Sequence, residues 1–249
     1  MRSPRTAAGE RVYAIGDIHG RLDLLEQLIG LIRQDNAGRP PASVRMVCVG
    51  DIIDRGPESA EIVRRCMDFS RRTDRFVVLK GNHKAMLVDG LGGNFLALSL
   101  WLRSGGGPAL TSWGVADDLV ARGPSRELVK AALASISAET LDWLAALPLL
   151  CRSGDYLFVH AGIRPGVPID RQTAEDLMWI RDDFLRSDAD HDGLVVVHGH
   201  SISETGVVSK PNRIGIDTGA YRTNILTAVM LDGDERRTFS TCETTATSF

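Results

Sequence analysis

The sequence predicts an α/β sandwich in which helices cover sheets of mixed strand direction. Short runs rich in β-branched residues alternate with longer stretches of helical spacing, which is typical of partly parallel sheets flanked by helices. The last runs follow one another with only short connections, which indicates that the sheets are mixed. Because the 249 residues show no sharp shift in composition, one domain over residues 1–249 is expected.

The individual elements follow from spacing along the chain. After the first expected strand, residues 11–15, apolar side chains recur at helical spacing from Leu22 to Ile32. The stretch after Pro57 has the same character, and a proline suits the first turn of a helix. The other strand-like runs are residues 44–49, 75–79, 156–159, 194–197, 213–216 and 225–231.

Residues 87–150 interrupt this alternation and are expected to form an inserted helical cap. Two glycine-rich segments, 90–94 and 104–108, flank an apolar stretch, and a mainly helical region follows over residues 127–146. The glycines are read either as hinges or points of close approach, or as ordinary loop residues.

Composition argues against several classes of function. With 29 basic and 32 acidic side chains, the net charge of −3 gives no overall attraction to nucleic acid or to an anionic membrane. No segment approaches the roughly 20 apolar residues of a membrane span, and the N-terminus lacks a signal-peptide pattern. A cytoplasmic protein without nucleic-acid or membrane partners is therefore expected. The four cysteines lie far apart, which argues against a zinc knuckle or a disulfide framework.

Polar clusters follow the expected strands, where open α/β sheets gather their ligand sites. They are GDIHG (16–20), GDIIDRG (50–56), GNHK (81–84), HAG (160–162) and HGH (198–200). Nitrogen and oxygen donors without thiolate suit Mn²⁺, iron or zinc. A bridging carboxylate at Asp51 could join a site made by Asp17 and His19 to one made by Asn82 and later histidines. Such a pair lies about 3.5 to 4 Å apart in two-metal phosphoester hydrolysis.

In this order, the motifs resemble the phosphoprotein phosphatase family of calcineurin-like binuclear metallophosphoesterases over residues 11–231. The short loops and the DTGA at 217–220 are similar to the bacterial and phage branch, which includes diadenosine tetraphosphatases. The resemblance implies a calcineurin-like β-sandwich of mixed sheets flanked by helices, with the inserted helical cap. It also implies two divalent ions, with Mn²⁺ favoured and Fe or Zn as alternatives.

The resemblance further implies residue roles. Asp17 and His19 would hold the first metal, Asp51 would bridge, and the second metal would be held by Asn82, His160 and His200. His83 would be the general acid, oriented by Asp54, and the phosphate would be gripped by Arg55 and Arg181.

Some positions keep alternative interpretations. An internal salt bridge competes for Asp54 and Arg55, and a surface ion pair with its acidic neighbours competes for Arg181. If the strand before HGH continued, His198 and His200 would share a face, and spacing could not choose between them; the resemblance favours His200. Lys84 stands where the family usually has an acid, so its effect is open.

The expected function is metal-dependent phosphoester hydrolysis by two-metal activation of water. A protein phosphatase acting on phosphoserine or phosphothreonine, and also on phosphotyrosine, is favoured. The alternative is a hydrolase of dinucleoside polyphosphates, such as diadenosine tetraphosphate, or of another small phosphate compound. A non-catalytic phosphate-binding scaffold is disfavoured because a general acid, a bridge and phosphate arginines are all present. The partner is thus a phosphoprotein or a small phosphorylated molecule, and the oligomeric state is left open.

Overall fold

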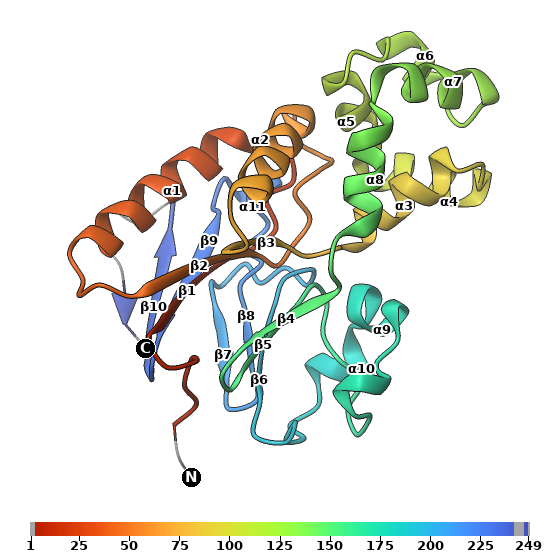
Figure 1. The fold of residues 1–249 in the computed structure, drawn as a ribbon. Helices are drawn as coiled ribbons and strands as arrows, with labels where there is room; N and C mark the ends of the chain where they lie inside the picture. The colour runs from red at the N-terminus through yellow and green to blue at the C-terminus, as the bar shows by residue number, and fades with distance from the viewer. Residues whose placement is uncertain (1–2, 242–246, 249) are drawn as a thin grey trace.

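Two β-sheets packed face to face form the centre of the protein (Figure 1). The computed structural model describes residues 3–241 and 247–248. The first sheet has the order β11-β10-β9-β1-β2-β3. Its strands are β1 (Glu10–Ile15), β2 (Ser43–Cys48), β3 (Phe76–Val78), β9 (Thr227–Asp232), β10 (Glu235–Ser240) and β11 (Thr247–Ser248). Strands β1, β2 and β3 are parallel, and β9 runs antiparallel to β1.

The second sheet has the order β4-β5-β6-β8-β7. Its strands are β4 (Leu150–Ser153), β5 (Tyr156–Val159), β6 (Val195–His198), β7 (Val208–Lys210) and β8 (Arg213–Gly215). Strands β5, β6 and β8 are parallel, and the two edge strands are antiparallel to their neighbours. The prediction of mixed sheets is therefore confirmed.

Alternate side chains along each inner strand belong to two different apolar clusters, one on each face of the sheet. Val12 and Ala14 of β1 face the second sheet, where Phe158 and Val197 meet them. Tyr13, next along β1, belongs to the cluster on the opposite face. Because successive strand residues point to opposite faces, each sheet buries both of its surfaces.

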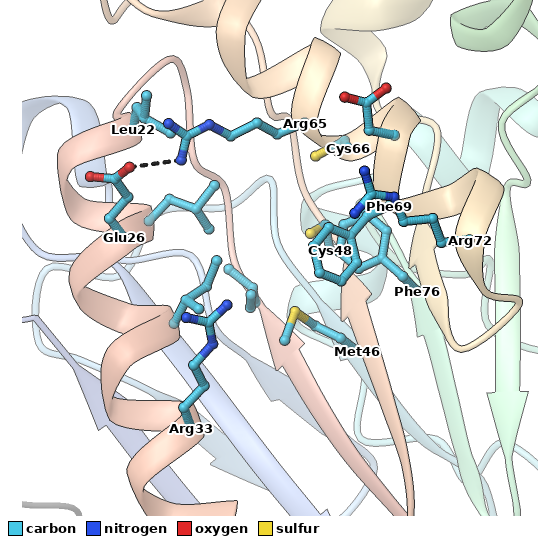
Figure 2. Close-up of a pocket in the computed structure, with 14 residues that line it drawn as sticks. Leu22, Glu26, Arg33, Met46, Cys48, Arg65, Cys66, Phe69, Arg72 and Phe76 are labelled. Carbon is cyan, nitrogen blue, oxygen red and sulfur yellow. Dashed lines mark hydrogen bonds and ion pairs between the residues drawn. The ribbon is translucent and has the colours of Figure 1, made fainter.

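Helices α1 (Leu22–Ala37) and α2 (Ser59–Arg72) cover the outer face of the first sheet. A groove of about 630 Å³ lies between them over β2, and the ion pair of Arg65 with Glu26, 2.7 Å long, spans it (Figure 2). None of the predicted metal ligands lines this groove. Burial raises the pKa of Cys48, at its floor, to about 12, so this thiol stays protonated. Cys242 lies outside the described residues.

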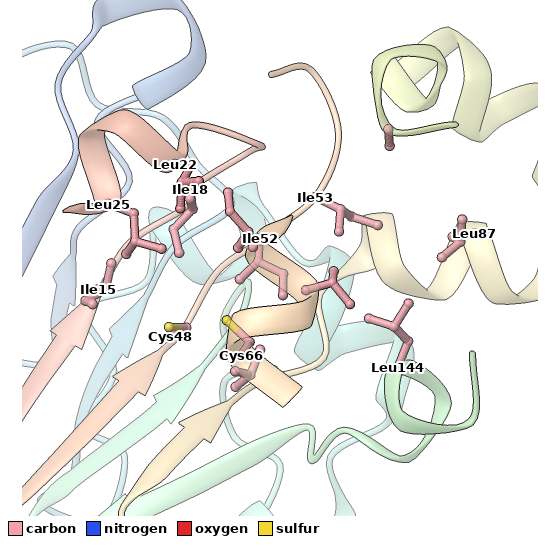
Figure 3. Close-up of a cluster of buried hydrophobic side chains, with 14 of the residues drawn as sticks. Ile15, Ile18, Leu22, Leu25, Cys48, Ile52, Ile53, Cys66, Leu87 and Leu144 are labelled. Carbon is pink, nitrogen blue, oxygen red and sulfur yellow. The ribbon is translucent and has the colours of Figure 1, made fainter. Parts of the chain in front are cut away.

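The same apolar cluster anchors the loops that follow β1 and β2. Ile18 lies between Asp17 and His19 in the sequence, and its side chain is fully buried beside Leu22 and Leu25 (Figure 3). The side chains of Ile52 and Ile53 are also fully buried, and they anchor the loop that follows Asp51. The polar motif residues are thus interleaved with apolar side chains that fix the path of each loop.

A helical segment connects β3 to β4, and Figure 1 shows α2 between this segment and α1. It comprises α3 (Asn82–Leu91), α4 (Phe95–Trp101), η1 (Leu102–Gly106), α5 (Gly107–Ser112), α6 (Asp117–Ala121), α7 (Arg126–Ser135) and α8 (Ala138–Ala146). The first helix begins at Asn82, directly after Gly81, and so earlier than the expected residue 87. The expected helical region 127–146 is two helices, because Ser137 caps α8 by accepting a hydrogen bond from the Thr140 N–H. The role of this segment as a cap stays a prediction.

The glycines of residues 104–108 are points of close approach. Gly105 has φ +107°, and a Cβ there would lie 2.6 Å from Cγ of Arg55. A Cβ on Gly106 would lie 2.5 Å from the Trp101 ring. Neither Gly105 nor Gly106 has room for a side chain, and the positive φ of Gly105 also favours glycine. The turn can therefore lie directly against the loop that carries Arg55.

The outer face of the second sheet is covered by η2 (Ile169–Arg171), α9 (Ala174–Trp179) and α10 (Asp182–Leu185). The short helix α11 (Ala220–Thr223) follows β8. Strands β4, β7 and β10 were not expected from the sequence, because they are short edge strands or polar ones such as ERRTFS. Within the described residues, no helix has the length and hydropathy needed to cross a membrane.

Candidate active site

The polar clusters meet where strands of both sheets end. Asp17 follows β1, Asp51 follows β2, and Asn82 follows β3 in the first sheet. His160 and His200 follow β5 and β6 in the second. A Cβ on Gly16 would lie 2.3 Å from the Ile216 carbonyl oxygen, so a glycine there lets the ends of β1 and β8 approach closely. All six predicted metal ligands are buried at this junction.

Asp51 lies at the centre of the cluster and is 1% exposed. Its Oδ2 is 3.3 Å from Nε2 of His160 and accepts a hydrogen bond from the His83 backbone N–H at 3.4 Å. Its Oδ1 is 3.4 Å from Nζ of Lys84. Burial alone would raise the pKa of Asp51. Together, the electrostatic effects of the neighbouring nitrogen groups, above all the His160 imidazole and the Lys84 ammonium, are larger than that of burial, and they hold the pKa well below its usual range. Asp51 is therefore a carboxylate shared by several neighbours.

The other predicted ligands surround Asp51. Nε2 of His160 lies 2.8 Å from Oδ1 of Asn82, and the rings of His160 and His200 have centroids 4.9 Å apart. On the other side, Nε2 of His19 lies 3.8 Å from Oδ2 of Asp17. Nδ1–H of His19 donates to the Ile53 carbonyl at 2.8 Å, so its Nε2 faces the cluster with a lone pair.

Burial sets the charges of these groups. It raises the pKa of Asp17 well above its usual value, and the nearby carboxylates of Asp217 and Asp51 raise it further. It lowers the pKa of His160 to about 4 and, together with the neighbouring His160, that of His200 to about 2. Neutral imidazoles beside crowded carboxylates are the donors that bind a divalent cation.

Two buried atoms of the cluster lack any hydrogen-bond partner within the described residues: Oδ1 of Asp17 and Nε2 of His200. Buried polar atoms of this kind need a partner, and both are metal-ligating atoms. Two groups of three side chains each have ligand atoms that all lie within 4.8 Å of one another. The first group is His19, Asp51 and His83, and the second is Asp17, Asp51 and His160. Asp51 belongs to both groups. The residues therefore fit divalent metal ions around a shared carboxylate.

The backbone at the site adopts conformations that most residues avoid. His19, Asp54, Arg55 and His200 have φ of 47°, 75°, 67° and 62°. Left-handed conformations at non-glycine residues cost of order 1–3 kcal/mol each and persist where the surroundings impose them. Here the buried Ile18, Ile52 and Ile53 anchor the loops that carry the first three of them.

His83 and Asp54 form a buried pair at the start of α3. Nδ1–H of His83 donates to Oδ2 of Asp54 at 2.5 Å, and the same oxygen accepts from Nε1–H of Trp101 at 2.7 Å. Burial raises the pKa of Asp54, although these hydrogen bonds oppose the rise. Asp54 therefore orients His83 with its Nε2 toward the cluster. The internal salt bridge with Arg55 is not found among the described contacts.

Arg55 points its guanidinium into the cluster. Nη1 donates to Nε2 of His19 at 3.0 Å and Nη2 to Nε2 of His83 at 3.2 Å. The guanidinium carbon lies 4.4 Å from the centre of the Tyr221 ring, and the Arg55 backbone N–H donates to the Gly105 carbonyl at 2.9 Å. Stacking and backbone contacts thus hold a planar cation where a phosphate would approach the metals.

Arg181 lies on the other side of the site and is exposed. Its charge is close enough to contribute to the low pKa of His200, after burial and His160. The acidic neighbours do not pair with it: Asp182 pairs with Arg186 at 3.0 Å, and Asp183 with Arg164 at 3.2 Å. Within the described residues its guanidinium has no hydrogen bond or ion pair. Its role in phosphate binding stays a prediction.

His198 and His200 point to different places. Strand β6 ends at His198, whose ring packs edge-on against Phe184 at 5.1 Å on the outer face of the sheet. The left-handed turn at His200 breaks the alternation and brings its ring beside His160. The condition for a shared face is therefore not met, and the structure brings only His200 into the cluster.

Three residues beside the site were not among those predicted from the sequence. Asp217 follows β8 and is 2% exposed, and burial raises its pKa to about 6. Its place after a strand, like that of the other clusters, was a signal that could have identified it. Tyr221 contacts His19 and Trp179 contacts His200, with ring centroids 5.5 and 6.4 Å apart. No pattern in the sequence marks these two rings.

The sequence matches the family described as calcineurin-like phosphoesterase over residues 10–223. The chain belongs to this family. Structures with a similar fold include a protein assigned as a diadenosine tetraphosphatase, with TM-score 0.63, 21% identity and coverage of 96% of this chain and 98% of that one. A cold-active protein tyrosine phosphatase has TM-score 0.60, 18% identity and coverage of 98% and 81%. The fold class expected from the sequence is confirmed, and the described residues include candidate groups for divalent metals.

Curated relatives include proteins named symmetrical bis(5'-nucleosyl)-tetraphosphatase. The one from Acidovorax sp. (strain JS42) is 31% identical over 160 residues, which cover 62% of this chain and 44% of the relative. The one from Janthinobacterium sp. (strain Marseille) is 32% identical over 153 residues, covering 61% and 44%. The match spans less than half the length of these relatives.

The contrast between the two histidines after β6 gives a matched test of the metal site. His200→Ala removes a buried nitrogen from the cluster, so Mn²⁺ binding measured by titration calorimetry should weaken by at least about tenfold. His198→Ala leaves Mn²⁺ affinity near that of the parent and lowers the urea midpoint of unfolding, because it leaves a cavity beside Phe184. Weak Mn²⁺ binding in His198→Ala together with unchanged binding in His200→Ala would reverse the assignment.

Proposed function

We propose that this phosphoesterase hydrolyses dinucleoside polyphosphates, such as diadenosine tetraphosphate, at a centre of two divalent ions. The observation that carries the proposal is the convergence of buried nitrogen and oxygen ligands on Asp51, with Arg55 directed into the same space. The substrate class is supported by relatives of 31–32% identity that carry that activity in their names. Water would attack a phosphorus of the polyphosphate chain and the bridging oxygen would leave with the other half, so cleavage of the central P–O–P linkage of diadenosine tetraphosphate would give two adenosine diphosphates.

The ligand sets proposed are those expected from the sequence. Asp17 and His19 would hold the first ion, Asp51 would be shared by both, and the second ion would be held by Asn82, His160 and His200. Bound ions would supply Lewis-acid activation of a water and of phosphate oxygens, and the oxygen and nitrogen donors favour Mn²⁺. His83 is left out of the ligand set although its ring is near His19, because the general-acid role expected from the sequence requires its Nε2 for the leaving oxygen.

The chain's own groups bind the phosphates and move the proton. Arg55 offers two N–H donors on one planar group, which matches the spacing of two phosphate oxygens. Arg181, exposed and unpaired in the described residues, supplies a second cation at the side of His200. Asp54 holds His83 through its Nδ1–H so that Nε2 is directed toward the cluster. The imidazolium form of His83, in which Nε2 no longer accepts from Arg55, would donate the Nε2 proton to the leaving oxygen.

Two aromatic rings flank the centre and suit the two nucleosides of such a substrate. Tyr221 lies against His19, which belongs to the first proposed metal site, and Trp179 lies against His200, which belongs to the second. The Trp179 side chain is 36% exposed, so a flat ligand can reach it. A nucleobase stacks on such rings, and a polyphosphate chain between two bases would pass over the metals.

The protein phosphatase favoured by the sequence remains the second candidate because of a surface on α4. Leu96 and Leu100, 76% and 40% exposed, lie one helical turn apart. The next turn of the chain contacts Arg55 through Ser104 and Gly105. An apolar helix face this close to the phosphate arginine could hold a polypeptide beside the site.

A substrate panel separates the two candidates. Protein stripped with chelator should be inactive, and activity restored by Mn²⁺ should show kcat/KM at least about tenfold higher for diadenosine tetraphosphate than for phosphoserine or phosphotyrosine peptides. Steady-state kinetics with phosphate and nucleotide detection measures both. A preference for the peptides would instead support the protein phosphatase, and full activity without metal would contradict both candidates.

The proposed base-stacking role of Trp179 has its own test. Trp179→Ala should raise KM for diadenosine tetraphosphate by about 5-fold or more, since stacking contributes about 1–3 kcal/mol per base. The rise for p-nitrophenyl phosphate, which has no base, should be much smaller. Equal effects on the two substrates would contradict base stacking and point to a general disturbance of His200.

The general-acid role of His83 predicts a dependence on the leaving group. An alkoxide needs a proton in the transition state and p-nitrophenolate needs little, and general acids contribute about 10²–10⁴-fold. His83→Asn should therefore reduce kcat for a phosphoserine peptide far more than for p-nitrophenyl phosphate, with unchanged metal content. Arg55→Ala is the comparison, because a phosphate grip is lost equally by both substrates. Equal losses in His83→Asn, with chemistry rate-limiting, would remove the acid role.

A further inference from the structure

Lys84 is a fully buried cation directly behind the candidate metal centre. It follows Asn82 and His83 on α3, and its side chain is 0% exposed. Its Nζ donates to the Gly50 carbonyl at 3.2 Å and to Oδ1 of Asp51 at 3.4 Å. Lys84 is neither one of the proposed metal ligands nor one of the groups proposed to bind phosphate or move a proton.

A buried ammonium needs compensation, because removing it from water costs several kcal/mol unless partners replace the lost hydration. The thiols of Cys48 and Cys66, both buried, lie close enough for Lys84 to lower their pKa values against the larger effect of burial. A protonated thiol cannot balance a charge. Asp51 is the carboxylate that Lys84 contacts, so the ammonium and the shared carboxylate stabilise each other.

The two oxygens of Asp51 have different surroundings. Oδ1 faces Lys84, whereas Oδ2 faces Nε2 of His160 and the backbone N–H of His83. A Cβ on Gly81 would lie 2.2 Å from Oδ1, so a glycine there gives this oxygen the room to turn toward Lys84. The lysine thus fixes the carboxylate by one oxygen and leaves the other directed at the predicted ligands.

We propose that Lys84 is a positioning residue that serves as a built-in counter-ion for Asp51. In the metal-free protein it offsets part of the repulsion among Asp17, Asp51 and Asp217. In the metal-bound protein the same positive charge opposes the ions, so it limits their affinity. Lys84 therefore stabilises the metal-free site and lowers its affinity for metal ions.

The direction of the effect follows from linkage. Removing the ammonium destabilises the metal-free state, which loses a counter-ion, more than the metal-bound state, where ions supply positive charge. Both the lost counter-ion and the lost repulsion make metal binding more favourable. This inference rests on the metal centre and not on the substrate, so it stands or fails independently of dinucleotide hydrolysis.

The test compares Lys84→Met and Lys84→Gln with the parent and with Lys80→Met. Lys80 is the matched control, since its Nζ donates to the Ala145 carbonyl at 2.9 Å and it lies on the same connection before α3. Melting temperature is measured without metal and with saturating Mn²⁺, and the Mn²⁺ Kd is measured by titration calorimetry. In both Lys84 variants the metal-free Tm should fall by at least about 4 °C. Mn²⁺ should recover most of that loss and bind at least about tenfold more tightly than to the parent.

A merely structural lysine gives a different pattern. If Lys84 only fills space, the variants lose the same stability with and without Mn²⁺, and the Kd does not change. If it chiefly orients Asp51 for the ions, Mn²⁺ binds more weakly. Either result overturns the counter-ion role, as does failure of both variants to fold in saturating Mn²⁺. A Lys80→Met variant that matched the Lys84 variants would show a general effect of net charge and would also overturn it.

Discussion

Repulsion among buried carboxylates is the constraint on which the site depends. Asp17, Asp51 and Asp217 are each at most 3% exposed and lie close enough to raise the pKa of Asp17. Such a group of charges is stable only if cations are close to it. Among the described groups, the Lys84 ammonium contacts Asp51, and Arg55 contacts the histidines beside it. These cations do not contact Oδ1 of Asp17, which is buried without a hydrogen-bond partner among the described residues. A divalent ion would supply the positive charge that this oxygen lacks.

The fold supplies this arrangement by bringing together strand ends from two different sheets. Parallel pairing of β1 with β2 and of β5 with β6 places their carboxyl ends at one edge, and close approach at Gly16 joins the two edges. Loops that leave these strands carry apolar residues such as Ile18 and Ile52 into the helix-covered core. The free energy of that burial offsets the strained backbone at His19 and Arg55. Stability of the core and geometry of the site are thus linked through the same few loop residues.

Much of this could be predicted from the sequence, because β-branched runs followed by polar residues mark a strand end in either sheet. The central strands and the polar clusters at their ends were anticipated for that reason. The strands β4 and β10 were not, because β4 is a short edge strand and β10, which lies between β9 and β11, has the polar sequence ERRTFS. The choice between His198 and His200 depended on a left-handed turn that spacing along the chain does not reveal. The contact of Lys84 with Asp51 was also hidden, since a lysine after GNH could equally have faced solvent.

The proposed function makes substrate choice depend on groups outside the ligand cluster, which accounts for the protein phosphatase favoured by the sequence and the dinucleotide favoured by the curated relatives. Ions held by proposed ligands such as Asp17 and His160 would bind a phosphate whatever it is attached to. Discrimination would then come from groups that contact the rest of the substrate, and Tyr221 and Trp179 are the aromatic groups proposed for this. Arg55 connects the ligand cluster to these surrounding groups. Its guanidinium stacks on Tyr221 and donates to His19, and its backbone N–H donates to the Gly105 carbonyl of the helical segment. A substitution in that segment can therefore displace the Arg55 guanidinium without touching a proposed metal ligand.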